Sequence, residues 1–141
     1  MKESKSLYPV NQYLEVFGDK WTLLIIRDIM FDGKRYFNEI RESDEKIASN
    51  ILTDRLNKLE KSGVILKTRD IKHKQKNIYT LTKTGIDLMP IIIAMSEWSL
   101  NHRKVSDKDR IHVSNLIKGG KALQNKMSAA LLEEFESISK N

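Results

Sequence analysis

The sequence predicts a mainly α-helical fold with one small antiparallel β-hairpin, arranged as a winged helix-turn-helix between flanking helices. Two observations within residues 36–83 support this prediction. In the first half of the stretch, apolar residues recur at helical spacing in two segments that a polar turn separates. In the second half, two alternating segments enclose a basic tip, which is typical of a hairpin.

Two helices are expected ahead of this unit. Residues 10–17 carry apolar side chains at helical spacing, with Pro9 suited to a first turn and Gly18 at the end. Asp19 is expected to cap the next helix, over residues 20–30.

The helix-turn-helix follows in a fixed order along the chain. Residues 35–36 suggest a very short strand, and residues 37–41 one or two helical turns. Residues 43–46 form the turn, and residues 48–61 the recognition helix, with Gly63 at its C-terminal cap.

Residues 64–71 and 77–82 are predicted to be paired strands, with residues 73–76 at the tip. Thr82 then caps a longer helix that reaches about Arg103 and that Pro90 bends.

We place a domain boundary after this helix. Residues 1–103 form the expected core, and residues 104–141 form a helical extension that Gly119 and Gly120 divide into two pieces.

Composition excludes several classes of protein. The chain has 141 residues and no cysteine, so disulfides, thiolate metal sites and cysteine redox switches are ruled out. The longest apolar run, near Pro90, is far short of the ~20 residues that span a bilayer. The N-terminus lacks the apolar segment of a signal peptide. We therefore expect a cytoplasmic protein with no membrane contact.

The basic residues are concentrated in the hairpin. The whole chain carries a net charge of +6, and residues 67–83 contain six basic residues against the single acidic residue Asp70. A local excess of this kind is the electrostatic pattern expected for phosphate binding, although a solvated hairpin would show it too.

The recognition helix has two distinct faces. Leu52, Leu56 and Leu59 form the stripe that must point to the core. The opposite face carries short polar side chains that suit base edges and phosphates, although Asp54 would oppose the DNA backbone at its own position. The candidate DNA-binding residues are Arg35, Ser49, Asn50, Thr53, Arg55, Asn57, Lys61, Lys72, His73, Lys74 and Lys76.

Several motifs together resemble one family. They are Gly18-x-Lys20-Trp21, Arg35-x-Phe37-x-Glu39-Ile40, Leu52-Thr53-x-Arg55-Leu56-x-x-Leu59 and Tyr79-x-Leu81-Thr82-x-x-Gly85. In this order and spacing, residues 8–103 resemble the HxlR-type bacterial winged-helix regulators, which share a layout with MarR-type regulators.

The resemblance implies a sequence-specific DNA-binding transcriptional regulator that acts as a homodimer on a two-fold-related operator. Its first and last core helices would form the dimer interface. The corresponding residues are Val10, Tyr13, Leu14, Phe17, Leu88, Ile91, Ile92, Met95 and Trp98.

The chain departs from the family in two ways. Many members carry a cysteine before the N-terminal proline, whereas this chain has Tyr8, so thiol sensing does not carry over. Residues 104–141 also extend beyond the usual end of the core. This extension could cover a pocket, bind a partner or, as we favour, add to the dimer contact.

The sequence also bears on functions other than DNA binding. The three histidines are dispersed, and no catalytic motif or cofactor fingerprint is present, so we expect neither an enzyme nor a cofactor nor a metal. A protein–protein interaction module with no specific DNA site is the alternative. A small apolar effector could also enter a pocket near Phe17, Trp21, Met89, Met95 and Trp98, although a packed core would use the same residues.

Overall fold

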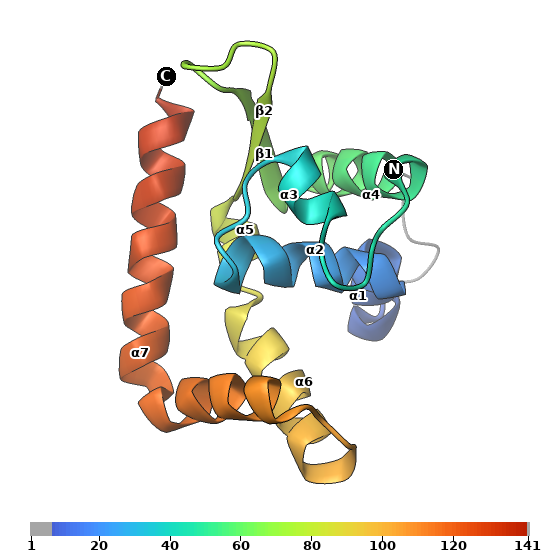
Figure 1. Cartoon of the computed structure of the whole chain (residues 1–141), viewed down its shortest axis with the longest axis vertical. Helices are drawn as coiled ribbons and strands as arrows, with labels where there is room; N and C mark the ends of the chain where they lie inside the picture. Colours follow the sequence, from blue (N-terminus) through green and yellow to red (C-terminus); the bar gives the residue numbers. More distant parts are fainter. Residues whose placement is uncertain (1–6, 141) are drawn as a thin grey trace.

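A computed structural model describes residues 7–140 of the chain. Residues 1–6 and residue 141 lie outside the described residues, and so does most of the N-terminal segment in which no signal peptide is expected. The elements are α1 (Pro9–Phe17), α2 (Lys20–Phe31), α3 (Phe37–Arg41), α4 (Ser49–Lys61), β1 (Ile65–Arg69), β2 (Asn77–Leu81), α5 (Lys83–Ile86), α6 (Met89–His102) and α7 (Asp107–Ser139). The fold is mainly α-helical with one two-stranded antiparallel sheet, as predicted (Figure 1).

Local signals in the sequence set the helix ends. The Asp19 carboxylate accepts two backbone N–H groups of the first turn of α2, at 3.0 and 3.1 Å. Gly63 follows α4 with φ of 76°, a left-handed conformation that disfavours side chains with a Cβ. The Thr82 hydroxyl accepts the N–H of Gly85 and caps α5. All three caps confirm the predictions.

The hairpin is shorter than predicted, and a backbone group outside its two strands also bonds to it. Its register pairs Ile65 with Leu81 at the base and Arg69 with Asn77 towards the tip. The expected strand at residues 35–36 is absent, but the carbonyl of Arg35 accepts the N–H of Tyr79 at 2.8 Å. One backbone hydrogen bond therefore joins the start of the helix-turn-helix to β2, without a ladder long enough to make a strand.

The single long helix expected after Thr82 is wrong. The chain forms α5 and then α6, with a break at residues 87–88. Pro90 lies in the first turn of α6, and a proline ring there excludes the carbonyl four residues earlier, that of Ile86, from a continuous helix. The proline therefore ends one helix and begins the next rather than bending a single helix.

The core lies between α2, α4, the hairpin and α5. Fully buried apolar side chains come from α2, α4 and the hairpin, and Ile40 of α3 and Met89 of α6 join them, while Ile86 of α5 is nearly buried. The buried apolar residues are Ile25, Ile26, Ile29, Met30, Ile40, Ile47, Leu52, Leu56, Leu59, Val64, Ile65, Tyr79, Leu81, Ile86, Leu88, Met89, Ile93 and Leu116.

The extension forms α7, which changes direction at Gly120. This residue has φ of 58° and ψ of −155°, which confirms the predicted division of the extension into two pieces. The first piece lies along α6, and the second stands beside the hairpin (Figure 1). The core boundary that we placed after residue 103 falls in the short link between α6 and α7, and it stays a prediction.

The apolar stripe of the second piece is used within the chain. Leu123, Met127 and Leu131 pack against the core of the same protomer. Within the protomer this stripe covers β2 and α5, and the added dimer contact that we favoured for the extension stays a prediction. Within residues 7–140 no helix is both long and apolar enough to cross a membrane.

Candidate nucleic-acid interface

The outer face of α4 is polar and open to solvent. Ser49, Asn50, Thr53, Asn57 and Lys61 are all exposed, while the leucine stripe on the opposite face is buried. The residue that caps α4 is Ala48, which offers no side-chain hydrogen bond, so Ser49 is the first helical residue. The Ser49 hydroxyl is therefore not used as a cap, and the N-terminal turn has the positive dipole end that suits phosphate.

The negative charge of Asp54, which was expected to oppose the DNA backbone, has two cationic partners on α4. Its carboxylate lies 3.2 Å from the ammonium of Lys58 and 2.5 Å from the guanidinium of Arg55. The hydrogen bond from Lys58, together with that from Arg55, holds the pKa of Asp54 below its ordinary value. The negative charge is therefore balanced within α4.

Arg55 itself is held away from solvent. Its Nε lies 3.1 Å from the carboxylate of Asp19, the residue that caps α2, so the side chain ties α4 to the start of α2. A phosphate contact of Arg55 stays a prediction, and it would require the side chain to leave Asp19. The sequence did not reveal this partner because the two residues are 36 positions apart.

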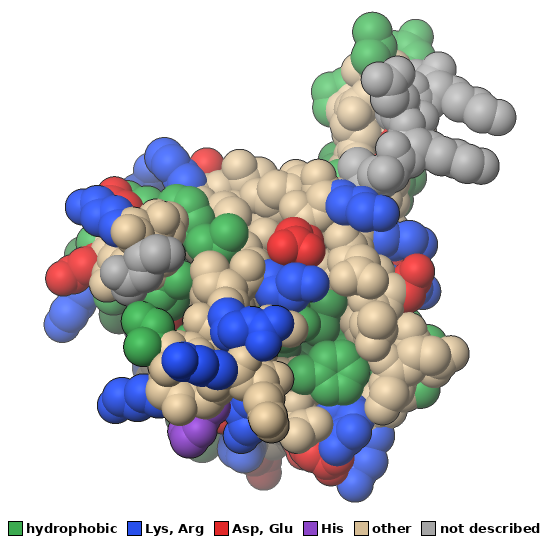
Figure 2. Space-filling model, turned by 90° about the horizontal axis from the view of Figure 1, so that it is seen from above, with side chains coloured by type: hydrophobic (Ala, Val, Ile, Leu, Met, Phe, Trp, Pro, Cys, Tyr) green, Lys and Arg blue, Asp and Glu red, His purple; other side chains and the backbone are tan. Residues whose placement is uncertain are grey.

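The tip of the hairpin carries the predicted basic residues. Lys72, His73, Lys74 and Lys76 are all exposed, and the hairpin projects beyond α4 (Figure 1). Figure 2 looks onto this end of the molecule, where Lys and Arg side chains are spread over the surface.

A buried carboxylate that the sequence analysis counted only as a negative charge fixes the tip. Asp70 is 6 % exposed and accepts the Tyr36 hydroxyl at 2.6 Å and the backbone N–H of Lys72 at 3.0 Å. These bonds, that from Tyr36 foremost, lower the pKa of Asp70. The ammonium of Lys76 lies 5.5 Å from the centre of the Tyr36 ring. The tip is therefore attached to the start of α3. In the sequence, the feature that could have indicated this role is a single acidic residue among basic ones.

Arg35 is occupied elsewhere. Its guanidinium contacts the carboxylate of Glu134 in α7, and its Nη1 donates to the carbonyl of Ile29 at 2.6 Å. In this structure the side chain is therefore engaged within the protomer, unlike the lysines of the tip. A contact spanning 99 positions leaves no trace in local sequence patterns.

The residues expected at the dimer interface fall into three groups. Six of them are exposed, namely Val10, Tyr13, Leu14, Ile91, Met95 and Trp98. Phe17 and Ile92 are half-buried against the core. Leu88 is buried in the core, because it lies in the break between α5 and α6 and points inward, so it does not belong to the exposed apolar face.

The apolar pocket expected near Phe17, Trp21, Met89, Met95 and Trp98 stays a prediction. In the protomer Met89 is fully buried, and two cavities among residues 7–140 have none of these five residues in their walls. One of these cavities, of about 530 Å³, lies between α2, α6, α7 and the turn after α3. Within the same residues no group of three or more His, Asp or Glu side chains could hold a metal ion.

Comparisons with known proteins agree on one family. Residues 16–107 match the family described as HxlR-like helix-turn-helix. The HTH-type transcriptional regulator YybR of Bacillus subtilis is 36 % identical over 118 residues, which cover 78 % of this chain and 92 % of YybR. YdeP of the same organism is 35 % identical over 100 residues, which cover 71 % of this chain and 77 % of YdeP.

Solved structures with the same fold include two regulators. The redox regulator HypR in its oxidised form has a TM-score of 0.59 and 37 % identity, over 70 % of this chain and all of HypR. The reduced form of YodB from B. subtilis has a TM-score of 0.58 and 29 % identity, over 72 % of this chain and all of YodB.

Proposed function

Because the chain belongs to the HxlR family of helix-turn-helix transcription regulators, we propose that it acts as a homodimer on a two-fold-related operator beside the promoter that it controls. The family is one of DNA-binding regulators and not of enzymes. The specific operator, the dimer and a response to an effector are the parts that we propose.

The observation that carries the proposal is the pairing of an uncommitted polar helix face with a basic hairpin tip. Ser49, Asn50 and Thr53 are exposed near the N-terminus of α4, which is the end of a recognition helix that usually lies deepest in the major groove. The lysines of the tip would bind phosphates along the adjacent backbone. We assign the base contacts to α4 and the phosphate contacts to the tip, with Asn57 and Lys61 further along the groove.

Exposed apolar side chains on α1 and α6 support the dimer. Tyr13, Met95 and Trp98 are 46, 52 and 56 % exposed, which is unusual for large apolar residues and typical of a surface that a partner covers. A second copy related by a two-fold axis would place the two α4 helices in successive major grooves, about 34 Å apart.

A signal would act by changing the separation of the two recognition helices. HypR is by its name a redox regulator, but the present chain has no cysteine, so a thiol cannot be the sensor here. We therefore propose a bound effector rather than an oxidation step. A protein–protein interaction module remains the alternative, and it predicts no selectivity among DNA duplexes.

Selection from a pool of random duplexes tests the proposal, together with light scattering of the free protein. We expect an enriched sequence with two inverted half-sites and a mass twice that of the chain. A monomer that enriches no sequence would refute both the homodimer and the operator, and would leave the interaction module as the function.

A further inference from the structure

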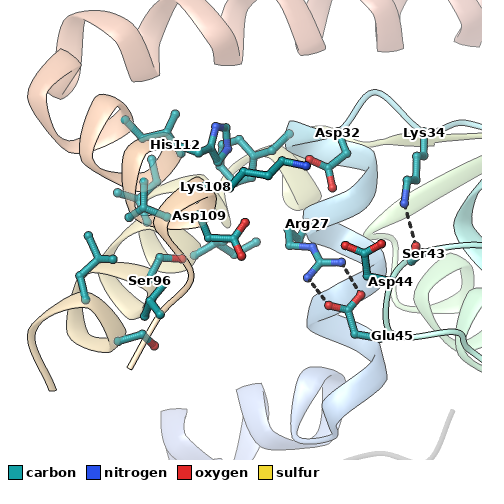
Figure 3. Close-up of a pocket in the computed structure, with 18 of the residues that line it drawn as sticks. Arg27, Asp32, Lys34, Ser43, Asp44, Glu45, Ser96, Lys108, Asp109 and His112 are labelled. Carbon is teal, nitrogen blue, oxygen red and sulfur yellow. Dashed lines mark hydrogen bonds and ion pairs between the residues drawn. The ribbon is translucent and has the colours of Figure 1, made fainter. Parts of the chain in front are cut away.

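A cavity of about 530 Å³ lies at the junction of the DNA-binding unit and the extension. Its walls are α2, the turn between α3 and α4, α6 and the first piece of α7 (Figure 3). This volume is within the usual range for small-molecule sites. Nothing in the family match accounts for the α7 wall, because the match ends at residue 107 and Lys108, Asp109, His112, Val113 and Leu116 lie beyond it.

Part of the cavity wall is apolar. Phe31 of α2, Ile92 and Leu100 of α6, and Val113 and Leu116 of α7 contribute to it. The imidazole of His112 lies edge-on to the Phe31 ring, with 6.2 Å between the ring centres. An apolar body of modest size would therefore find contact surface on three helices.

Acidic side chains line other parts of the wall, at the end of α2, on the turn before α4 and on α7. Five carboxylates line the cavity against three cationic groups, an excess of two negative charges. The carboxylates are those of Asp32, Glu42, Asp44, Glu45 and Asp109.

Two of the three cations are already committed to other partners. Arg27 donates to Glu45 at 2.8 and 3.0 Å and to the buried Asp28 at 2.7 Å. Lys34 lies 2.8 Å from the Ser43 hydroxyl and 3.5 Å from Asp28. The remaining cation, Lys108, points across the cavity toward Asp32 (Figure 3).

The remaining acids lack full compensation. Asp44 has no ion-pair partner among residues 7–140, and the Asp109 carboxylate accepts only the Ser106 hydroxyl, at 2.7 Å. Burial raises the pKa of Asp32, and the nearby charge of Asp28 adds to this effect. A positive charge entering the cavity would relieve this repulsion, whereas an anion would increase it.

We propose that this cavity binds an organic cation with an apolar body, such as an aryl-alkyl amine. Asp32, Asp44 and Asp109 would supply the negative potential that attracts the ammonium group, and the apolar residues would contact the rest of the molecule. This inference rests on the proposed function and gives a chemical class to its effector, at a site other than the one expected near Phe17 and Trp21.

The position of the cavity explains how such a ligand would matter. Residues 42–45 form one of its walls and are also the turn that joins α3 to the recognition helix α4. The wall from α6 belongs to the helix that carries the exposed apolar face. A ligand here would therefore contact both the DNA-binding unit and the helix that we assign to the dimer.

Isothermal titration of the full chain with three matched probes tests the proposal without DNA. The probes are 4-phenylbutylamine, 4-phenylbutan-1-ol and 4-phenylbutanoate, which share a phenylalkyl body and carry a positive, a neutral and a negative head group. We expect the amine to bind at least about tenfold more tightly than the carboxylate, with the alcohol between them, a difference of about 1.4 kcal/mol. Equal affinities for the amine and the carboxylate would overturn the proposal.

Variants locate the binding. The combined substitutions Asp32→Asn, Asp44→Asn and Asp109→Asn should reduce the amine to the affinity of the alcohol. The matched control, Asp87→Asn with Glu133→Gln and Glu136→Gln, removes three exposed acids outside the cavity and should leave the preference intact. An amine preference that survives in the triple variant, or that the control removes equally, would refute the site.

Two further measurements keep the test independent of folding and of DNA binding. If the triple variant does not fold, two single substitutions replace it. Asp44→Asn, on an exposed turn, should weaken binding of the amine at least threefold (about 0.65 kcal/mol). Ser96→Phe should fill the cavity and abolish binding of both the amine and the alcohol. Full amine affinity in both would overturn the proposal. A chain that binds the amine selectively but no operator would support the site and refute the proposed function alone.

Discussion

The guanidinium of Arg35 and the carboxylate of Glu134 form a two-point ion pair, with N–O distances of 2.8 and 2.9 Å between groups 99 positions apart in the chain. Arg35 lies where the chain enters the helix-turn-helix, and Glu134 lies near the end of the extension. The pair therefore attaches the second piece of α7 to the DNA-binding unit. Both side chains are partly solvent-accessible, so the contribution to stability is modest.

Replacing Glu134 with Ala should release the end of α7. We expect the melting temperature to fall by roughly 3–5 °C, corresponding to about 1 kcal/mol. Amide hydrogen exchange should quicken in residues 121–139 and not in α4. Glu133→Ala is the control, because Glu133 is the exposed neighbour and has no ion pair in the described residues. Equal exchange in the two variants would show that the pair does not hold α7.

Replacing Lys72, Lys74 and Lys76 with Ala should weaken binding to every duplex. The loss of two or three phosphate contacts should reduce the slope of log K against log salt by roughly two to three units. Filter binding at several salt concentrations measures it. The same number of Ala substitutions at Lys118, Lys121 and Lys126 of α7 provides the control and should leave the slope nearly unchanged. A wild-type slope in the hairpin variant would place the tip away from phosphate.

Asn50→Ala should mainly erode discrimination between sequences. If the amide makes a two-point contact with a base edge, its loss costs about 1–3 kcal/mol on the operator and little on unrelated DNA. Competition binding against operator and scrambled duplexes gives this ratio. Asn115→Ala, on α7, should leave it unchanged. A uniform loss on all duplexes would assign Asn50 to the backbone instead.

Trp98→Glu should dissociate the dimer. The side chain is 56 % exposed in the protomer, so a charge is tolerated in the monomer but would be buried without a partner in the interface. Sedimentation should show at least about a tenfold rise in the dimer dissociation constant, or about 1.4 kcal/mol. Ile71→Glu makes the same change at an exposed apolar residue of the hairpin, and its dimer should persist. An intact Trp98→Glu dimer would place the interface elsewhere.

Acid should remove the contribution of the Arg27 and Glu45 pair. The hydrogen bonds from Arg27 lower the pKa of Glu45 from an ordinary 4.5 to about 2. Because the folded-state pKa is the lower one, the pair stabilises the fold above pH 4.5, and this contribution declines as the pH falls towards 2. Glu45→Gln should cost about 1–2 kcal/mol near neutral pH after allowance for solvent screening.

Urea unfolding between pH 7 and 2 checks this expectation. The difference in free energy of unfolding between wild type and Glu45→Gln should decrease as the pH falls and approach zero near pH 2. A difference of constant size would mean that the lost stability has another origin than the charge of Glu45.

Features governed by neighbouring residues could be predicted from the sequence. Asp19, Gly63 and Thr82 act on backbone groups within a turn or so of themselves, so their roles follow from residue type and position. The same holds for the exposed face of α4, because helical periodicity alone separates it from the leucine stripe.

Features that depend on distant contacts could not be predicted. The partners of Arg35 and Arg55 are far away in the chain, so local patterns do not show these contacts, and the expected role of both residues in DNA binding stays a prediction. Leu88 was assigned to a continuous helix surface, and the break at Pro90 turned it into the core. The charged cavity requires four separate segments to meet, which no local pattern encodes.

The turn at Gly120 has a consequence for the stretch that follows it. Each residue of an α-helix advances the side chains by about 100° around the axis. Inserting or deleting one residue between Gly120 and Glu134 would therefore swing the carboxylate away from Arg35. The length of this stretch is therefore constrained by the ion pair, whereas its outward-facing side chains are free to change.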